Sequence, residues 1–249
     1  MRIKEKDVII SMSGGLDSTC LALHMLSLGY RIKAYSFRYG QKHSVELKKL
    51  KRNIGFLAGK LPEQILSYQE IDLTPVFDES VSSLSIFGNG DIPAGEYDNG
   101  NMASTVIENR NIIFASIIYG KALSWSKKSG RECIITLGIH TGDHVIYPDC
   151  TERSQKAVAH TFKISNWGSE AVTYSAPFNK LDKGGVLAKG IAAMRKLGFT
   201  DKEITYVLKN THTCYDPDDK GRSCGRCGSC TERKAAFEAN GMKDPAQYI

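Results

Sequence analysis

A short glycine-rich loop constrains the fold of this chain more than any other feature. Residues 8–12 form an apolar run typical of a buried strand, and residues 17–28 carry apolar side chains at helical spacing. Between the two stands the motif Ser13-Gly14-Gly15-Leu16-Asp17-Ser18-Thr19. Two glycines at a strand-to-helix turn let the backbone aim its amides at a phosphate, and the helix N-terminus favours the same anion. The motif therefore predicts a nucleotide phosphate site within an α/β fold, with Asp17 placed to orient Mg²⁺ or the loop itself.

Strand and helix alternate along most of the chain. The apolar spacing predicts further strands at residues 32–37, 64–68, 133–138 and 172–175, and helices at 45–58, 110–128, 151–162, 182–197 and 201–209. Five strands in such an alternation predict a doubly wound, Rossmann-like parallel sheet with its ligands outside the carboxyl ends of the strands. The polar segment 74–104 is too long for an ordinary connection, and we expect a mobile active-site lid there.

Four of the seven cysteines crowd into one short segment. They are Cys214, Cys224, Cys227 and Cys230. Four thiolates with two chelating C-x-x-C steps suit tetrahedral Zn²⁺, and such a closed site is structural because it leaves no position for substrate. An iron–sulfur cluster and free redox thiols are the alternatives. We expect residues 1–200 to form the nucleotide-binding domain and residues 201–249 to form a helical zinc-binding segment packed on it.

Bulk properties exclude several classes of protein. No apolar run approaches the roughly 18 residues that a membrane span needs, and the first residues lack the apolar stretch of a secretory signal, so we expect a cytoplasmic protein. The formal net charge of +6 suits anionic small molecules. It falls short of the concentrated basic patch of a dedicated nucleic-acid binder, and we do not expect nucleic acid as the direct substrate.

The glycine-rich loop lacks the Lys-Ser or Lys-Thr ending of a Walker A motif and the spacing of a dinucleotide fingerprint. It resembles the PP-loop, Ser-Gly-Gly-x-Asp-Ser, of ATP pyrophosphatases, which accompanies attack on the α-phosphate of ATP and release of pyrophosphate. Three further segments carry a narrower resemblance: Phe-Arg-Tyr-Gly-Gln-Lys-His at 37–43, residues 138–150 with their Tyr-Pro-Asp-Cys ending, and Thr-His-Thr-Cys-Tyr at 211–215. Together they resemble the 7-cyano-7-deazaguanine synthase family (QueC, also called ExsB) over almost the whole chain.

The resemblance implies an ATP-dependent carbon–nitrogen ligase. Its substrate would be 7-carboxy-7-deazaguanine, whose carboxylate ATP adenylates before ammonia displaces AMP to give the amide. A second ATP would then activate the amide oxygen, and loss of AMP would give the nitrile. The implied cofactors are ATP, Mg²⁺ and Zn²⁺, and the implied assembly is a homodimer.

Site residues carry over by position. We expect ATP on the loop residues Ser13, Gly14, Gly15, Leu16, Asp17, Ser18 and Thr19. The candidate catalytic residues are Lys183, Arg110 and Asp17. The candidate substrate-binding residues are Tyr39, Gln41, Asp143, Tyr147 and Asp149. Solvated positions for Arg110 and Lys183, and simple loop structure for Asp143, Tyr147 and Asp149, are the competing interpretations.

Three departures from the family pattern leave the product open. Glu108 stands where the family has proline, Arg153 lies in a changed stretch after Cys150, and Arg38 replaces a residue that is commonly acidic. We expect these changes at the rim of the substrate site. A diverged member could stop at the amide or join the deazaguanine to another amine in a DNA-modification or antiviral pathway. A PP-loop tRNA-modifying enzyme and a non-catalytic zinc-ribbon module are the alternatives from other classes.

Overall fold

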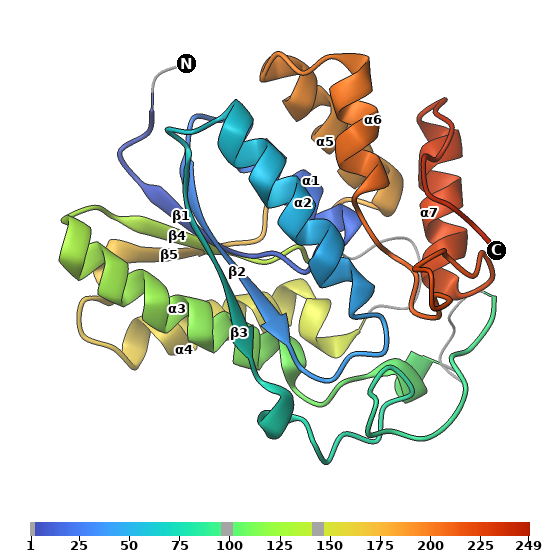
Figure 1. Cartoon of the computed structure of the whole chain (residues 1–249). Helices are drawn as coiled ribbons and strands as arrows, with labels where there is room; N and C mark the ends of the chain where they lie inside the picture. Colours follow the sequence, from blue (N-terminus) through green and yellow to red (C-terminus); the bar gives the residue numbers. More distant parts are fainter. Residues whose placement is uncertain (1–2, 96–101, 141–146) are drawn as a thin grey trace.

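The computed structural model describes residues 3–95, 102–140 and 147–249. Its centre is a five-stranded, wholly parallel sheet in the order β3-β2-β1-β4-β5 (Figure 1). The strands are β1 (Asp7–Ser11), β2 (Arg31–Arg38), β3 (Ile65–Asp72), β4 (Cys133–Thr136) and β5 (Val172–Ser175). The predicted doubly wound α/β sheet is therefore confirmed, and the chain reverses direction across the sheet at β1, where ligands of such folds bind.

Helices cover both faces of the sheet. They are α1 (Leu16–Ser27), α2 (Val45–Lys60), α3 (Arg110–Ser129), α4 (Glu152–Ile164), α5 (Lys183–Lys196), α6 (Asp201–Lys209) and α7 (Gly228–Ala239). Short 3₁₀ turns join them: η1 (Thr74–Val76), η2 (Met102–Thr105), η3 (Pro148–Cys150) and η4 (Ser169–Ala171). Of these seven helices the sequence predicted all but α7. None of the helices in the described residues is long and apolar enough to cross a membrane.

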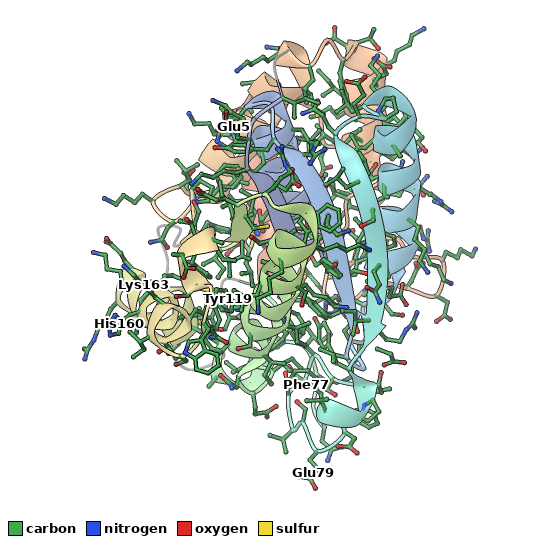
Figure 2. All side chains as sticks on the ribbon, turned by 90° about the vertical axis from the view of Figure 1, so that its left-hand side faces the viewer. Glu5, Phe77, Glu79, Tyr119, His160 and Lys163 are labelled. Carbon is green, nitrogen blue, oxygen red and sulfur yellow. The ribbon has the colours of Figure 1, made fainter. Side chains whose placement is uncertain are left out.

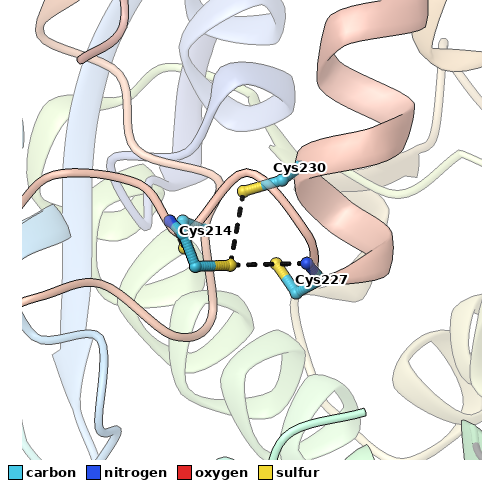
Figure 3. Close-up of side chains that lie close together, drawn as sticks. Cys214, Cys227 and Cys230 are labelled. Atoms are coloured by element: carbon cyan, nitrogen blue, oxygen red, sulfur yellow. Dashed lines mark hydrogen bonds between the residues drawn. The ribbon is translucent and has the colours of Figure 1, made fainter. Parts of the chain in front are cut away.

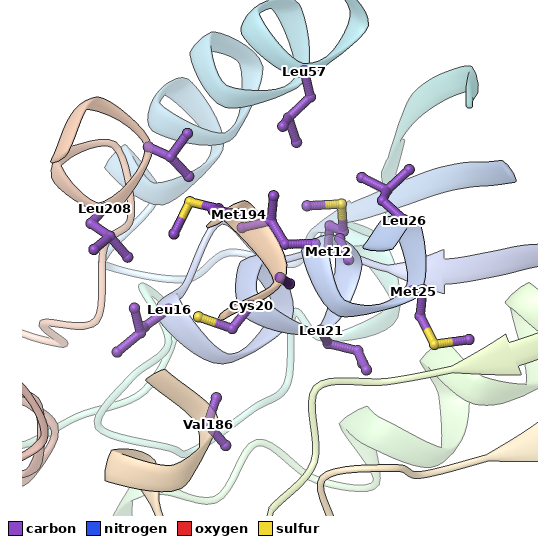
Figure 4. Packing of buried hydrophobic residues seen from close by; sticks show 14 of the residues in the cluster. Met12, Leu16, Cys20, Leu21, Met25, Leu26, Leu57, Val186, Met194 and Leu208 are labelled. Atoms are coloured by element: carbon purple, nitrogen blue, oxygen red, sulfur yellow. The ribbon is translucent and has the colours of Figure 1, made fainter. Parts of the chain in front are cut away.

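The central strand β1 shows why both faces of the sheet are packed against helices. Every residue of β1 is buried, and its side chains alternate between two cores. Val8 and Ile10 belong to the core under α1, α2, α5 and α6, whereas Ile9 belongs to the core under α3 and α4. In the first core, Leu16 and Leu21 of α1 lie among side chains of α2, α5 and α6 (Figure 4).

The second core is rich in aromatic rings. Tyr119 of α3 stacks on Phe162 of α4 with ring centroids 4.4 Å apart, and the Tyr119 hydroxyl donates to the Phe162 carbonyl at 3.0 Å. Figure 2 shows α3 on one side of the sheet and α2 on the other, with His160 and Lys163 of α4 pointing outward. This packing joins the middle of α3 to α4, and α3 begins at Arg110.

The segment predicted as a lid is partly ordered by the rest of the chain. Isolated bridges pair Ser85 with Gln41 and Ala94 with Cys227, and the Gly95 amide donates to the Arg226 carbonyl at 2.8 Å. The segment thus contacts the chain after β2 through Ser85 and the cysteine cluster through Ala94. That it moves stays a prediction.

The C-terminal residues share the first core. Ile204, Val207 and Leu208 of α6 and Phe237 of α7 pack in the same cluster as β1 and α1. The division of the chain at residue 200 therefore stays a proposal.

Candidate active site

A cavity of about 610 Å³ opens at the carboxyl ends of the strands. Its walls are the glycine-rich loop, the chain after β2, the starts of α3 and α5, the chain after β4, and α7. A mostly apolar cleft of this size with a few convergent polar groups is the usual form of a small-molecule site. The position is the one that the sheet topology predicts.

The glycine-rich loop forms a tight turn between β1 and α1. Gly14 has φ +95°, and a Cβ at this position would lie 2.4 Å from the Glu46 carbonyl oxygen, so only glycine fits without a shift. The Gly15 amide donates to Ser13 Oγ at 3.1 Å, and Ser13 Oγ lies 3.2 Å from Ser18 Oγ. These bonds hold the loop so that the N-terminus of α1 faces the cavity.

The predicted ATP-binding residues divide into two groups. Within the described part of the chain, Ser13, Gly15, Asp17 and Ser18 line the cavity, whereas Gly14, Leu16 and Thr19 do not. Leu16 and Thr19 are fully buried. The second group therefore supports the turn from behind rather than facing the space that a ligand would fill.

Asp17 and Lys183 come together although they lie far apart in the sequence. Lys183 Nζ lies 3.6 Å from Asp17 Oδ2 and 2.8 Å from Glu232 Oε2, and His140 Nε2 lies 3.5 Å from Asp17 Oδ2. Burial alone would raise the pKa of Asp17, but the charge of Lys183 and the contact with His140 outweigh burial and hold this pKa well below its usual range. Lys183 is 9% exposed, so the solvated interpretation of this lysine does not hold.

The opposite wall carries the other candidates. Arg110 Nη1 donates to Tyr39 Oη at 3.4 Å, and Asn111 Nδ2 donates to Asp149 Oδ2 at 2.8 Å. Tyr147 Oη lies 2.7 Å from Thr105 Oγ1. Arg110, Tyr39, Tyr147 and Asp149 all line the cavity. The structure thus brings the catalytic candidates and three of the substrate candidates to one space.

Two substrate candidates are not placed on this wall. Gln41 is 2% exposed and, within the described residues, does not line the cavity. Its side chain accepts from the Tyr39 amide at 2.9 Å and donates to the Phe37 carbonyl at 3.2 Å, which shapes the turn after β2. Asp143 lies outside the described residues.

Sequence reasoning missed the buried acid Glu46. Its carboxyl lines the cavity at 5% exposure, with Oε1 3.3 Å from Gln41 Nε2 and 3.7 Å from His43 Nε2. Burial raises the pKa of Glu46 to about 8 and lowers the pKa of His43 to about 3. No motif marks this residue, because an acidic side chain in the first turn of a helix is ordinary.

Glu232 was missed for a similar reason. It lies on α7, lines the cavity, and contacts Lys183. Only proximity across the fold shows its partner, since nothing in the local sequence distinguishes it from a solvated helix residue.

The four clustered cysteines converge on one point. The Sγ atoms of Cys214, Cys224, Cys227 and Cys230 all lie within 4.8 Å of one another. Backbone amides point at them: the Cys224 amide donates to Cys214 Sγ at 3.2 Å and the Cys227 amide to Cys224 Sγ at 3.3 Å. Figure 3 shows three of the side chains facing a common centre. Four sulfurs with amide donors fit a tetrahedral metal site.

The three residues that depart from the family pattern do not belong to the cavity wall, within the described part of the chain. In the described residues, Glu108, Arg153 and Arg38 do not line the cavity. The Glu108 carboxylate accepts from Ser80 Oγ at 2.6 Å and from the Val81 amide, and Arg38 pairs with Glu70 at 2.6 Å. The expectation that these changes border the substrate is thus not supported by their positions.

Comparisons with known proteins agree over nearly the full chain. A family model described as "Queuosine biosynthesis protein QueC" matches residues 7–241. A 7-cyano-7-deazaguanine synthase of Marinomonas sp. (strain MWYL1) is 34% identical over 247 residues, 99% of both chains. One from Caldicellulosiruptor bescii is 34% identical over 96% of both chains. The 7-cyano-7-deazaguanine synthase 2 of Colwellia psychrerythraea is 35% identical over 98% of this chain and 99% of that protein. The matched range contains the glycine-rich loop and all four clustered cysteines.

Proposed function

Because this chain belongs to the family of queuosine biosynthesis proteins described as QueC, we propose that it is an ATP-dependent 7-cyano-7-deazaguanine synthase. Family membership confirms the resemblance predicted from the sequence. The observation that carries the proposal is a cavity in which the phosphate loop faces Lys183, Arg110 and a wall of aromatic and carboxyl groups. ATP and an acid substrate can meet there.

The first step would join the acid to AMP. A carboxylate oxygen of 7-carboxy-7-deazaguanine attacks the α-phosphorus of ATP, and the bond to pyrophosphate breaks with its electrons on the leaving group. The amides of the loop at Ser13–Ser18, the ammonium of Lys183 and the guanidinium of Arg110 would stabilise the charge that gathers on the phosphate oxygens. Asp17 would hold Lys183 at this position.

Mg²⁺ fits the same corner of the cavity. Asp17 Oδ1 is buried and has no hydrogen-bond partner among the described residues. A carboxylate oxygen of this kind, together with phosphate oxygens, is the usual environment of Mg²⁺, which would supply positive charge to the phosphates.

Ammonia would complete the sequence. Its lone pair forms the carbon–nitrogen bond to the acyl-adenylate, AMP leaves with the electrons of the carbon–oxygen bond, and the nitrogen loses a proton to give the amide. A second ATP activates the amide oxygen in the same way, and departure of AMP with loss of two further protons gives the nitrile. We place the deazaguanine ring between Tyr39 and Tyr147, with Asp149 beside it.

We also propose Zn²⁺ for the cysteine cluster, a cytoplasmic homodimer, and a C-terminal zinc-binding segment from residue 201 onward. The sulfur donor set supports Zn²⁺, and the closed set of four ligands supports a structural role.

Mass spectrometry of the products tests the function. Purified protein is incubated with ATP, Mg²⁺, ammonium and 7-carboxy-7-deazaguanine, and nitrile, amide, AMP and pyrophosphate are quantified. We expect nitrile with two AMP per product from the wild type, and product formation that is much slower but still measurable from Lys183→Met. Amide with one AMP, or a conjugate of a different mass, would make the chain a diverged member, and absence of AMP would refute the proposal.

The sulfur-transfer alternative is not favoured. A PP-loop enzyme of that kind uses a cysteine pair outside a metal cluster. Of the three cysteines outside the cluster, Cys150 lines the cavity, whereas Cys20 and Cys133 are fully buried in separate cores.

A further inference from the structure

The start of α7 connects the cysteine cluster to the cavity. Cys227 is the N-cap residue of α7, Cys230 lies in its first turn, and Glu232 follows two residues later. The cluster therefore fixes the position of the Glu232 backbone. At the other end of α7, Asn240 Nδ2 donates to the Gly184 carbonyl at 3.0 Å, which ties this end to the first turn of α5.

Lys183 is the first residue of α5, and this is an unfavourable place for a lysine. The helix N-terminus carries a partial positive charge, and the side chain is 9% exposed. Two acids offset these costs: Glu232 Oε2 at 2.8 Å and Asp17 Oδ2 at 3.6 Å. Burial would lower the pKa of Lys183, but the two carboxylates outweigh burial and keep this pKa above its usual value.

The two acids come from opposite ends of the chain and differ in what they can do. Asp17 lies in the first turn of α1, directly after the two glycines of the phosphate loop. Glu232 approaches from α7 and makes the shorter contact. Contacts from two elements restrict the Lys183 ammonium more than a contact from Asp17 alone would.

We propose that Glu232 is a positioning residue for adenylation: α7, anchored by the metal-binding cysteines, holds the Lys183 ammonium over the phosphate loop. This inference rests on the proposed function of the cavity. It gives the cysteine cluster a second role beyond folding, because the cluster sets the geometry of a group that would touch ATP.

A double-mutant cycle separates positioning from simple structural support. Glu232→Gln, Lys183→Met and the double variant are compared in AMP formation, with Glu232→Asp as the conservative change. Glu238→Gln, on the exposed side of the same helix, is the matched control. Metal content and melting temperature are measured for each variant.

We expect Glu232→Gln to lower kcat on the order of 10-fold, because a misplaced catalytic group costs rate more than binding, with less than about a 3-fold change in KM for ATP. Glu232→Asp should recover part of the loss, and Glu238→Gln should match the wild type. The double variant should be no slower than Lys183→Met alone. Additive losses, or a wild-type rate for Glu232→Gln, would overturn the proposal.

A labelling experiment tests the contact without measuring activity. The protein is treated briefly with an amine-acylating reagent, and each lysine is quantified by peptide mass spectrometry. Lys183 should gain label several-fold both in Glu232→Gln and in wild-type protein stripped of metal by a chelator. Lys33, which stacks on Trp125 at 4.0 Å, serves as the reference for global unfolding.

Unchanged Lys183 labelling in Glu232→Gln would refute the proposed contact. If chelation also raises the labelling of Lys33, metal removal has unfolded the protein as a whole. The test of the contact is then the labelling of Lys183 in Glu232→Gln, a variant that keeps its metal ligands. Because labelling needs no substrate, its outcome is independent of whether the wild type forms AMP from the deazaguanine acid.

Discussion

Glu46 makes the stability of this protein depend on pH in an unusual direction. Its carboxyl is 5% exposed, and burial raises its pKa from 4.5 to about 8. Below pH 4.5 the folded and unfolded chains both hold the proton. As the pH rises, only the unfolded chain ionises, so the free energy of unfolding falls until the folded acid also ionises near pH 8.

Glu46→Gln removes this titration while keeping the shape of the side chain. The shift of 8 − 4.5 = 3.5 units corresponds to about 5 kcal/mol at most, at 1.36 kcal/mol per unit. Between pH 5.5 and pH 8 the stability of the variant relative to the wild type should rise by about 3 kcal/mol. The groups that face Glu46, namely His43, Tyr39 and Arg110, are present in both proteins, and their own titrations largely cancel in the difference.

Urea unfolding at pH 5.5, 6.5, 7.5 and 8.5 measures this difference, with the cysteine cluster loaded in both proteins. Glu108→Gln is the control, because Glu108 is exposed and lies off the cavity wall. A difference between variant and wild type that stays flat over this range would mean that the folded acid ionises normally. The argument from burial would then be refuted.

Four further predictions concern other parts of the fold. Gly138→Ala would place a Cβ 2.8 Å from the backbone nitrogen of Ser18 in the phosphate loop. The free energy of unfolding should therefore fall by about 1–3 kcal/mol, and ATP affinity should weaken in calorimetry. Gly55→Ala, with open space around it, should instead stabilise α2 by about 1 kcal/mol. Cys227→Ser should abolish stoichiometric metal binding, measured by elemental analysis, and speed hydrogen exchange in α7. Asp244→Asn should cost about 3–5 kcal/mol in urea unfolding, because it leaves the buried Arg233 without its ion pair.

The parts of the fold that the sequence predicted are those whose signals are local. Strand, glycine pair and helix follow one another within residues 8–28, and the cysteines lie within one short segment. Their chemistry is therefore visible before any contact is known. The helix α7 was missed because few of its side chains reach the core, with Ala236 and Phe237 as its contribution.

The acids of the cavity could not be predicted, because their meaning depends on distant partners. Glu232 gains its role from Lys183, and Glu46 gains its raised pKa from the packing of α2 beneath the phosphate loop. The family resemblance also could not separate a residue that touches ligand from one that shapes a turn. Gln41 shows this, since its side chain is engaged by the backbone of its own loop.

The contact between Lys183 and Glu232 has a consequence for how the protein is made. A ribosome releases the phosphate loop long before α7, so a nascent chain can build the sheet while Lys183 still has only one of its two acids. The second acid reaches Lys183 only after α7 has emerged and, under our proposal, after the cysteine cluster has bound its metal ion. Under the proposed function, a cell short of that metal would therefore accumulate chains with an intact sheet and an incomplete catalytic centre.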